Sequence, residues 1–168
     1  MDEKPSRRSF SAALAAAAGI GALGKSVEAE AGKRTFEIEK TEAEWRALLT
    51  PEQFYVLREH GTERAFTSPL DKLYEAGTYH CAGCDLALFE SETKYDSGTG
   101  WPSFWQPIEG AIGTSVDYVL FYPRTEVHCR RCGGHLGHVF NDGPRPTGLR
   151  YCMNGIAMTF KPREQKSG

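Results

Sequence analysis

Cys129-Arg130-Arg131-Cys132-Gly133-Gly134-His135-Leu136-Gly137-His138 is the stretch that decides the fold, because it holds half of a metal-binding pattern. The other half is Cys81-Ala82-Gly83-Cys84, earlier in the chain. Each C-x-x-C pair places two thiolates on one tight turn, and two such turns close a tetrahedron around Zn²⁺ with Zn–S distances of about 2.3 Å. Glycines in and after the pairs let the backbone fold under the metal. We therefore predict one structural zinc ion held by Cys81, Cys84, Cys129 and Cys132.

Two other interpretations of the four cysteines exist. A thioredoxin-like redox pair requires a helix directly after its C-x-x-C, whereas Gly133-Gly134 and the strand-like Leu86–Phe89 follow here. Two disulfides remain an alternative for a protein exported to an oxidising compartment. With four thiolates the coordination shell of a zinc ion is closed, so such a metal supports the fold and performs no chemistry.

Composition indicates one soluble domain. The chain has 168 residues, of which 40% are hydrophobic and 25% charged, and its formal net charge is −2. A chain without a basic excess cannot neutralise many phosphates, so nucleic acid is not an expected partner.

The first residues have the pattern of an export signal. Arg7-Arg8 precedes a weakly apolar run at 11–24, and Ala29-Glu30-Ala31 follows as a small-x-small cleavage site. The paired arginines, with Phe10 after them, resemble a twin-arginine signal. The alternative interpretation is an Ala-rich surface helix.

We predict that residues 1–31 are this export signal and that residues 32–168 form the exported domain, located in the periplasm. The apolar run is shorter than the ~20 residues that span a bilayer, so we expect no stable membrane association after processing.

Capping patterns predict two short helices before the β region. Thr41 is followed three residues later by Glu44, and Thr50-Pro51 is followed by Gln53. Before them, Thr35–Lys40 alternates and is expected to be a short strand or an extended arm.

Beyond the helices, short segments rich in aromatic and β-branched residues alternate with turn residues. This pattern predicts a mainly β fold, a compact antiparallel β domain of two packed sheets (β-tent-like). The expected strands are Thr78–Cys81, Leu86–Phe89, Val116–Tyr122, Glu126–Cys129, Leu149–Met153 and Ile156–Phe160.

Cys152 is the one cysteine that the metal site leaves over. On a strand, Arg150, Cys152 and Asn154 face the same side, and a guanidinium beside a thiol favours the reactive thiolate. His135 and His138, which we expect in a Gly-flanked loop, offer an acid or base near neutral pH. A buried, inert cysteine is the alternative. The combination of these residues indicates a cysteine nucleophile.

Three motifs together resemble the B-type methionine sulfoxide reductases, the enzymes specific for the R epimer of the sulfoxide. The resemblance covers roughly residues 41–162 and rests on Tyr95–Phe104, Cys132–Pro144 and Arg150–Asn154, in the order of that family. It implies an oxidoreductase that repairs oxidised methionine in proteins or peptides.

The resemblance also implies roles for individual residues. Cys152 would attack the sulfoxide sulfur, His135 and His138 would protonate the leaving oxygen, and Asn154 would position the sulfoxide or the thiol. Trp101 would pack against the substrate's ε-methyl group.

Phe104 and Arg150 complete the expected substrate-binding set. Phe104 would form a wall of the cavity or part of the core, and Arg150 would pair with Asp142 and tune the thiolate.

Many family members carry a resolving cysteine where this chain has Thr99. Since four cysteines are assigned to zinc, we expect a thioredoxin-like or other external thiol to reduce the sulfenic acid of Cys152. We expect a monomer. The main alternative function is a zinc-stabilised binding module without enzymatic activity, which would not need a free thiol beside Arg150, Asn154 and two histidines.

Overall fold

The computed structural model describes residues 35–118 and 122–164. The predicted export signal, residues 1–31, lies outside these ranges. Among the residues that are described, none of the helices has the length and apolar character needed to cross a membrane.

Two helices begin where the capping patterns predict them. The first helix, α1 (Glu42–Leu48), follows Thr41, whose hydroxyl accepts a hydrogen bond from the backbone N–H of Glu44, while the Glu44 carboxylate accepts one from Thr41. The second, α2 (Pro51–Glu59), follows Thr50, which makes the same reciprocal pair with Gln53. Each such cap contributes about 1 kcal/mol to helix stability. Both predicted helix starts are confirmed.

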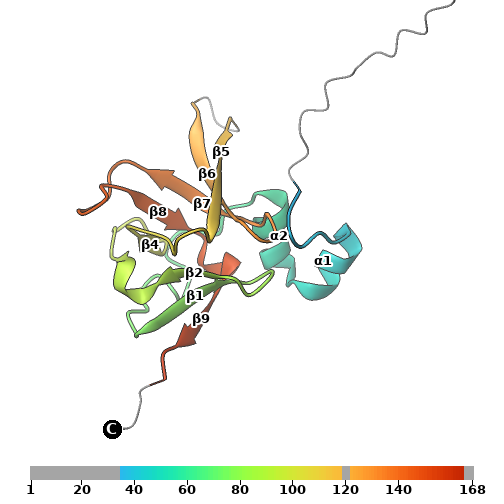
Figure 1. The fold of residues 1–168 in the computed structure, drawn as a ribbon, viewed down its shortest axis with the longest axis horizontal. Coiled ribbons are helices and arrows are strands. Elements are labelled where there is room, and N and C mark those ends of the chain that lie inside the picture. The colour runs from blue at the N-terminus through green and yellow to red at the C-terminus, as the bar shows by residue number, and fades with distance from the viewer. Residues whose placement is uncertain (1–34, 119–121, 165–168) are drawn as a thin grey trace, which may run out of the picture. The chain divides into compact units, whose positions relative to one another are not determined.

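The remaining elements form two antiparallel sheets, which confirms the predicted mainly β class (Figure 1). One sheet has the order β2-β1-β9 and the other the order β3-β4-β8-β7-β6-β5. The strands are β1 (Gly77–Cys81), β2 (Ala87–Glu90), β3 (Lys94–Tyr95), β4 (Ser103–Phe104), β5 (Ile112–Asp117), β6 (Arg124–Cys129), β7 (His135–Phe140), β8 (Arg150–Met153) and β9 (Met158–Pro162), with short 3₁₀ turns at Ser91–Thr93 and Gly155–Ala157.

Three predicted segments differ from the structure. The strand expected at Val116–Tyr122 begins earlier, at Ile112, and ends at Asp117. The strand expected from Ile156 begins only at Met158, after the 3₁₀ turn. Of the two forms expected for Thr35–Lys40, the strand is absent, and the segment is held by a hydrogen bond from the Ile38 N–H to the Arg131 carbonyl (3.0 Å). Pairing with neighbours, rather than local propensity, sets these boundaries.

The largest correction concerns His135 and His138, which lie on a central strand and not in a loop. β7 pairs with β6 on one side and with β8 on the other. Its glycines suggested a loop, but Gly137 serves close strand approach, since a Cβ there would collide with the carbonyl oxygen of Cys152.

The two sheets pack through a cluster of aromatic rings. Phe89 of β2 and Phe104 of β4 stack with centroids 4.3 Å apart, and Tyr79 of β1 meets Phe104 edge-on at 4.9 Å. Phe104 is 0% exposed. Of the two roles expected for Phe104, it therefore has the core position between the sheets, and its place in the substrate-binding set is not supported.

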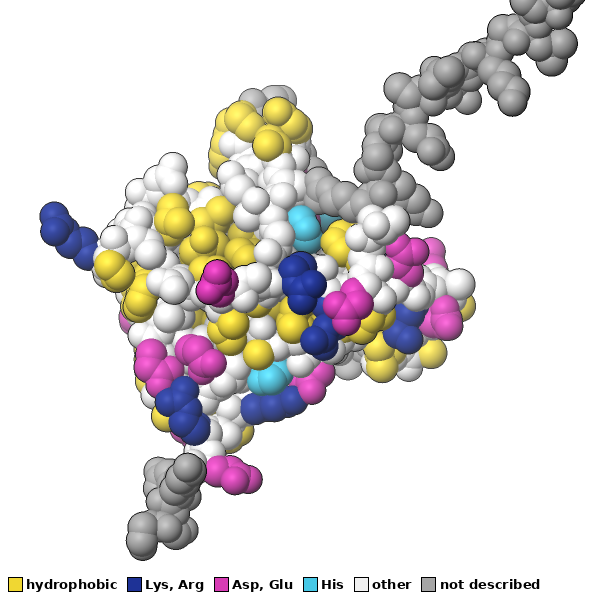
Figure 2. Space-filling model, viewed as in Figure 1, with side chains coloured by type: hydrophobic (Ala, Val, Ile, Leu, Met, Phe, Trp, Pro, Cys, Tyr) yellow, Lys and Arg dark blue, Asp and Glu magenta, His cyan; other side chains and the backbone are white. Residues whose placement is uncertain are grey.

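Charged side chains of both signs are interspersed over the face shown in Figure 2. Among the exposed pairs are Arg46 with Glu42 on α1 and Lys161 with Asp85. Such exposed pairs add little to stability and balance charge locally.

Candidate active site and metal centre

The four cysteines of the two C-x-x-C turns converge as predicted. The Sγ atoms of Cys81 and Cys132 lie 3.7 Å apart, and those of Cys84 and Cys129 lie 3.5 Å apart. A tetrahedron with Zn–S bonds of about 2.3 Å has sulfur atoms about 3.8 Å from one another. A disulfide would require about 2.05 Å, and all four thiols are free. The geometry fits a bound metal ion and not two disulfides.

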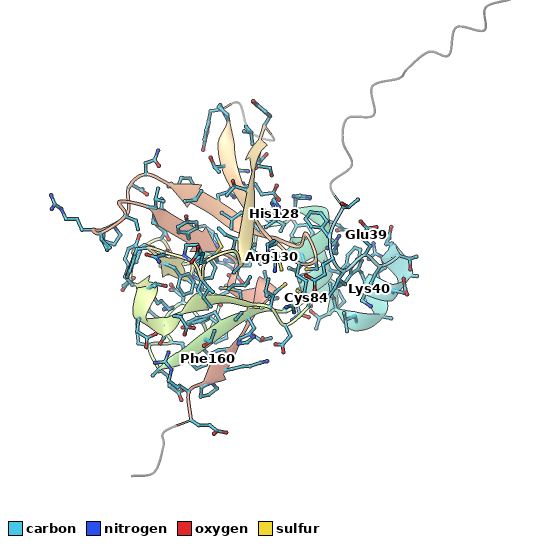
Figure 3. The ribbon with its side chains drawn as sticks, in the orientation of Figure 1. Glu39, Lys40, Cys84, His128, Arg130 and Phe160 are labelled. Atoms are coloured by element: carbon cyan, nitrogen blue, oxygen red, sulfur yellow. The ribbon has the colours of Figure 1, made fainter. Side chains whose placement is uncertain are left out.

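The metal centre is packed against the helices. Figure 3 shows Cys84 at the side of the sheets that faces α1 and α2. The Arg58 guanidinium donates to the Cys132 carbonyl (3.0 Å) and lies 4.7 Å over the Trp45 ring. A Cβ on Gly134 would press against the Leu57 side chain. The centre therefore joins the helices to the β6–β7 turn, as a structural site would.

Cys152 lies on β8 between two partner strands. Ser103 of β4 stands opposite Cys152 on one side, and His138 of β7 stands opposite it on the other. Directly opposed residues in antiparallel strands have Cβ atoms about 4.5–5.5 Å apart, close enough for their side chains to interact. The sheet thus places a thiol beside an imidazole and a hydroxyl.

Hydroxyl groups surround the thiol of Cys152. The Thr99 hydroxyl lies 3.9 Å from the Cys152 sulfur. The Ser97 hydroxyl lies 2.8 Å from that of Thr99 and 2.7 Å from that of Ser103. Burial raises the pKa of the Cys152 thiol, and the hydroxyls of Thr99 and Ser103 and the charge of Arg150 offset part of that rise. The resting group is thus a thiol whose anion has stabilising partners.

A β-bulge brings the two histidines to the same face. Along β6 and β7, Glu126 pairs with His138 and His128 pairs with His135, so β7 contains one extra residue between them. Residues three apart on a regular strand face opposite sides, but the extra residue restores the same side. The rings of His135 and His138 meet edge-on, with centroids 5.3 Å apart.

His138 is the imidazole next to the thiol. Its Nε2 donates to Oδ2 of Asp117 (2.7 Å), which is also bound by the Arg124 guanidinium (2.6 Å). Burial lowers the pKa of His138, and its hydrogen bond to Asp117 only partly opposes this. The imidazole is therefore neutral at neutral pH.

His135 lies behind His138. Its side chain is 2% exposed, and its Nδ1 donates to Oε1 of Glu126 (2.8 Å). The same carboxylate oxygen lies 2.9 Å from Nδ1 of His60, at the end of α2. His135 therefore supports the site from within and does not reach its open surface.

A small pocket of about 150 Å³ opens beside the thiol. Its lining combines an indole, an imidazole and a thiol with apolar surface: Thr62, Trp101, Arg124, Gly137, His138, Phe140, Cys152, Met153 and Asn154. Of the predicted catalytic and substrate-binding residues, the structure brings Cys152, His138, Trp101 and Asn154 together here. His135, Phe104 and Arg150 are outside the lining.

Glu63 holds three parts of the pocket in place. Its backbone N–H donates to the Asn154 side chain (2.9 Å), and its carbonyl accepts from the Trp101 indole (3.1 Å). Its carboxylate accepts from the backbone N–H groups of Gly155 and Ile156. Burial raises the pKa of Glu63. Because the other side of the Asn154 amide donates to the Leu136 carbonyl (3.1 Å), Asn154 is a clamp between β7 and β8.

Arg150 forms the predicted ion pair. Its guanidinium makes two hydrogen bonds of 2.8 Å to the Asp142 carboxylate and lies 4.4 Å over the Phe140 ring. Arg150 packs against Phe140, which lines the pocket, and is not itself a lining residue. Its expected direct contact with substrate is therefore not supported.

Several residues of the site were not found from the sequence: Thr62, Glu63, Asp117, Arg124 and Glu126. Each comes from a segment distant from the cysteine and histidine motifs, and only the sheet pairing brings them together. The sole local signal is that Thr62 and Glu63 are polar residues directly after a helix end.

Comparison with known proteins gives the family. The SelR domain family matches residues 49–162. The chain belongs to the SelR domain family. The "Peptide methionine sulfoxide reductase MsrB" of Agrobacterium fabrum is 55% identical over 127 residues, which cover 75% of this chain and 94% of that protein. The protein of the same name from Pseudomonas putida is 57% identical over 129 residues, covering 76% of this chain and 97% of its own length.

A plant relative extends the comparison. "Peptide methionine sulfoxide reductase B1, chloroplastic" of Oryza sativa is 52% identical over 131 residues, 77% of this chain and 61% of that protein. The family thus includes oxidoreductases named for methionine sulfoxide reduction, and the pocket around Cys152 lies within the matched residues.

Proposed function

We propose that this protein reduces methionine-R-sulfoxide, free or in a peptide, to methionine. The observation that carries the proposal is the free thiol of Cys152, in a pocket that also presents the Trp101 indole and the His138 imidazole. Family membership supports the reaction, and the R-epimer specificity follows the resemblance to B-type enzymes.

The first step is attack of the Cys152 sulfur on the sulfoxide sulfur. As the two sulfur atoms approach, the S–O bond of the sulfoxide breaks and a new S–O bond forms to the Cys152 sulfur. Methionine leaves as the thioether. Cys–SH and the sulfoxide thus become Cys–SOH and the thioether. The sulfoxide sulfur is reduced by two electrons and the cysteine is oxidised by two, to a sulfenic acid.

His138 moves the proton in this step. Since burial raises the pKa of the thiol and lowers that of the imidazole, the resting pair is a thiol and a neutral imidazole. The proton that leaves Cys152 is the one that the oxygen needs, and His138 carries it, held by Asp117. His135 keeps His138 in place, and Asn154 fixes the strand that bears the nucleophile. The indole of Trp101 gives the sulfoxide methyl group an apolar face.

An external thiol completes the cycle. Thr99 occupies the position nearest to the Cys152 sulfur from the neighbouring loop, and it cannot form a disulfide. Two equivalents of an external thiol, or one dithiol of the thioredoxin type, reduce Cys–SOH to Cys–SH, with release of water and formation of the partner's disulfide.

We propose that the ion held by the four cysteines is zinc, in a structural role. The sulfur spacing and the all-thiolate donor set support Zn²⁺, which accepts four sulfur ligands in a tetrahedron. A metal analysis that finds no zinc in purified protein, with two disulfides instead, would contradict this.

The sequence pattern of residues 1–31 supports a further part of the proposal, export through a twin-arginine signal to the periplasm and repair of exported proteins there. That route carries folded proteins, so the zinc would be bound before export. Cell fractionation of a variant with Arg7→Lys and Arg8→Lys should find the protein retained in the cytoplasm, whereas Lys25→Arg should be exported like the wild type. Equal export of both variants would contradict the twin-arginine assignment.

Turnover of dabsylated methionine-R-sulfoxide with dithiothreitol tests the function. The wild type should reduce the R epimer and leave the S epimer, and Cys152→Ser should be inactive while it keeps one zinc ion and the wild-type melting temperature. Equal activity of wild type and variant would overturn the proposal.

A further inference from the structure

A second group of metal-binding side chains lies apart from the four cysteines. It consists of His60, where α2 ends, Glu126 of β6 and His135 of β7. Their donor atoms, Nδ1 of each histidine and a carboxylate oxygen of the glutamate, all lie within 4.8 Å of one another. Three elements that are distant in the sequence thus present two imidazoles and one carboxylate to a common point.

The spacing of the three donors is close to that of a metal site. Oε1 of Glu126 stands 2.9 Å from Nδ1 of His60 and 2.8 Å from Nδ1 of His135. A metal with bonds of about 2.1 Å holds neighbouring ligand atoms about 3.0 Å apart at a right angle and about 3.4 Å apart in a tetrahedron. The two imidazole nitrogens lie within 4.8 Å of each other, so one ring has to move until both reach a common ion. His60 can make this movement, because its side chain is 61% exposed.

The surroundings favour a cation. Burial alone would raise the pKa of Glu126, but hydrogen bonds from His135 and His60 outweigh it and hold that pKa well below its usual range, so the carboxylate is ionised. The Ser115 hydroxyl donates to its other oxygen and fixes its orientation. Two imidazoles and a carboxylate with open positions are a common donor set for divalent transition metals.

The second nitrogen of His135 bears on how this ring could bind a metal. The Nε2 atom of His135 is buried and has no hydrogen-bond partner among the residues that the structure describes. When Nδ1 binds a metal, the proton of a neutral imidazole moves to Nε2, and no hydrogen bond at that atom has to be broken for it.

We propose that His60, Glu126 and His135 form a second, exchangeable site for a divalent transition metal ion. The ion takes the place of the hydrogen bonds from the two imidazoles to Glu126, each ring then carries its proton on Nε2, and solvent fills the remaining coordination positions from the side of His60. The site is open and held by nitrogen and oxygen, in contrast to the closed sulfur site of Cys81, Cys84, Cys129 and Cys132.

Occupancy of this site would slow the reductase, a consequence that rests on the proposed function. His135 packs edge-on against His138, and His60 is followed two residues later by Thr62, which lines the pocket. A metal bound to His60 and His135 ties these two segments together and restricts the motion of the imidazole that carries the proton.

The test is titration with Co²⁺ of the full chain, loaded with one zinc ion and free of affinity tags. Cys152→Ser is used as the background, so that its thiol does not bind the probe. We expect one equivalent of Co²⁺ with the weak visible absorption of a nitrogen–oxygen site and no sulfur charge-transfer band. In the same background, His60→Ala should weaken binding by at least about 100-fold, since it removes a direct ligand and loss of a mere supporting residue costs 10–100-fold.

Glu59→Gln is the matched control. Glu59 neighbours His60, is exposed and pairs with Arg46, outside the cluster, so this variant should bind Co²⁺ like its parent. Absence of a Co²⁺ equivalent, or an equivalent that persists in His60→Ala, would overturn the site. Because binding is read without turnover, an inactive protein that binds Co²⁺ would contradict the proposed function and leave the metal site standing.

With Cys152 restored, Zn²⁺ should slow turnover of the wild type and not of His60→Ala. Equal slowing would overturn the inhibitory role.

Discussion

The chain holds its cysteines in two contrasting environments. Cys81, Cys84, Cys129 and Cys132 each have another cysteine sulfur within hydrogen-bond distance, on turns packed against the helices. Cys152 instead faces the hydroxyl of Thr99 from a strand paired with β4 and β7. Sulfur next to sulfur creates a place for a metal, and sulfur next to hydroxyl, imidazole and guanidinium groups creates a place for chemistry.

The difference shows that the neighbours of a thiol, and not its burial, determine whether it binds a metal or reacts. Burial raises the pKa of Cys152, as it would for an inert core cysteine. What distinguishes Cys152 is that each cross-strand neighbour is polar and that the pocket reaches its sulfur.

The largest expected effect comes from breaking the metal centre. Cys132→Ser should lose the zinc ion and unfold cooperatively only at a much lower temperature, because structural zinc supplies on the order of 10 kcal/mol of binding free energy to a fold. Thermal unfolding and metal analysis measure this. Cys152→Ser is the control and should melt like the wild type. Similar melting of both variants would show that the metal centre does not hold the fold.

The next effect separates proton transfer from nucleophile reactivity. His138→Gln should lower kcat/KM for the R-sulfoxide by about 10²–10⁴-fold, the range for loss of a positioned acid–base group. Alkylation of Cys152 by iodoacetamide should fall less, because it needs no proton on a leaving oxygen and because Thr99, Ser103 and Arg150 still favour the thiolate. An equal fall in alkylation would mean that His138 acts on the thiol alone and not on the sulfoxide oxygen.

The residues of the metal centre could be predicted from the sequence far more completely than those of the pocket. Two C-x-x-C pairs carry their ligand spacing within each turn, so Cys81, Cys84, Cys129 and Cys132 were predictable as a set. The pocket depends on pairing across strands, and neither Glu63 nor Asp117 has a local pattern that points to it.

Two errors have physical causes. The glycines of β7 resembled a loop because their role, close approach to β8, exists only in the folded sheet. Phe104 stands beside a predicted pocket motif but alternates to the opposite side of β4 from Ser103, where it meets Phe89.

A smaller effect is expected at Thr99. Burial raises the pKa of the Cys152 thiol, so its alkylation rate should increase with pH and reach half its limit above the ordinary pKa of cysteine. Thr99→Val removes a hydroxyl that stabilises the thiolate, moves this midpoint upward and slows alkylation at neutral pH by about two- to tenfold, the worth of one ordinary hydrogen bond. Thr99→Ser should behave like the wild type. A downward shift in Thr99→Val would contradict this account of the hydroxyl.

The smallest effect should come from the ion pair behind the pocket. Asp142→Asn should change the free energy of unfolding by no more than about 1 kcal/mol, because the Asp142 side chain is 63% exposed. Arg150→Gln should slow alkylation of Cys152 more than Asp142→Asn does, since the guanidinium charge favours the thiolate. Denaturant unfolding and alkylation kinetics measure both. Equal alkylation rates would show that Arg150 does not act on the sulfur.

The most direct test of the two sulfur environments is to ask which thiol takes up the sulfoxide oxygen. After one equivalent of methionine-R-sulfoxide without a reductant, a sulfenic-acid trap followed by mass spectrometry should label Cys152 stoichiometrically and leave the other four cysteines unlabelled. A disulfide between Cys152 and any of those four, or trapping at one of them, would contradict the account.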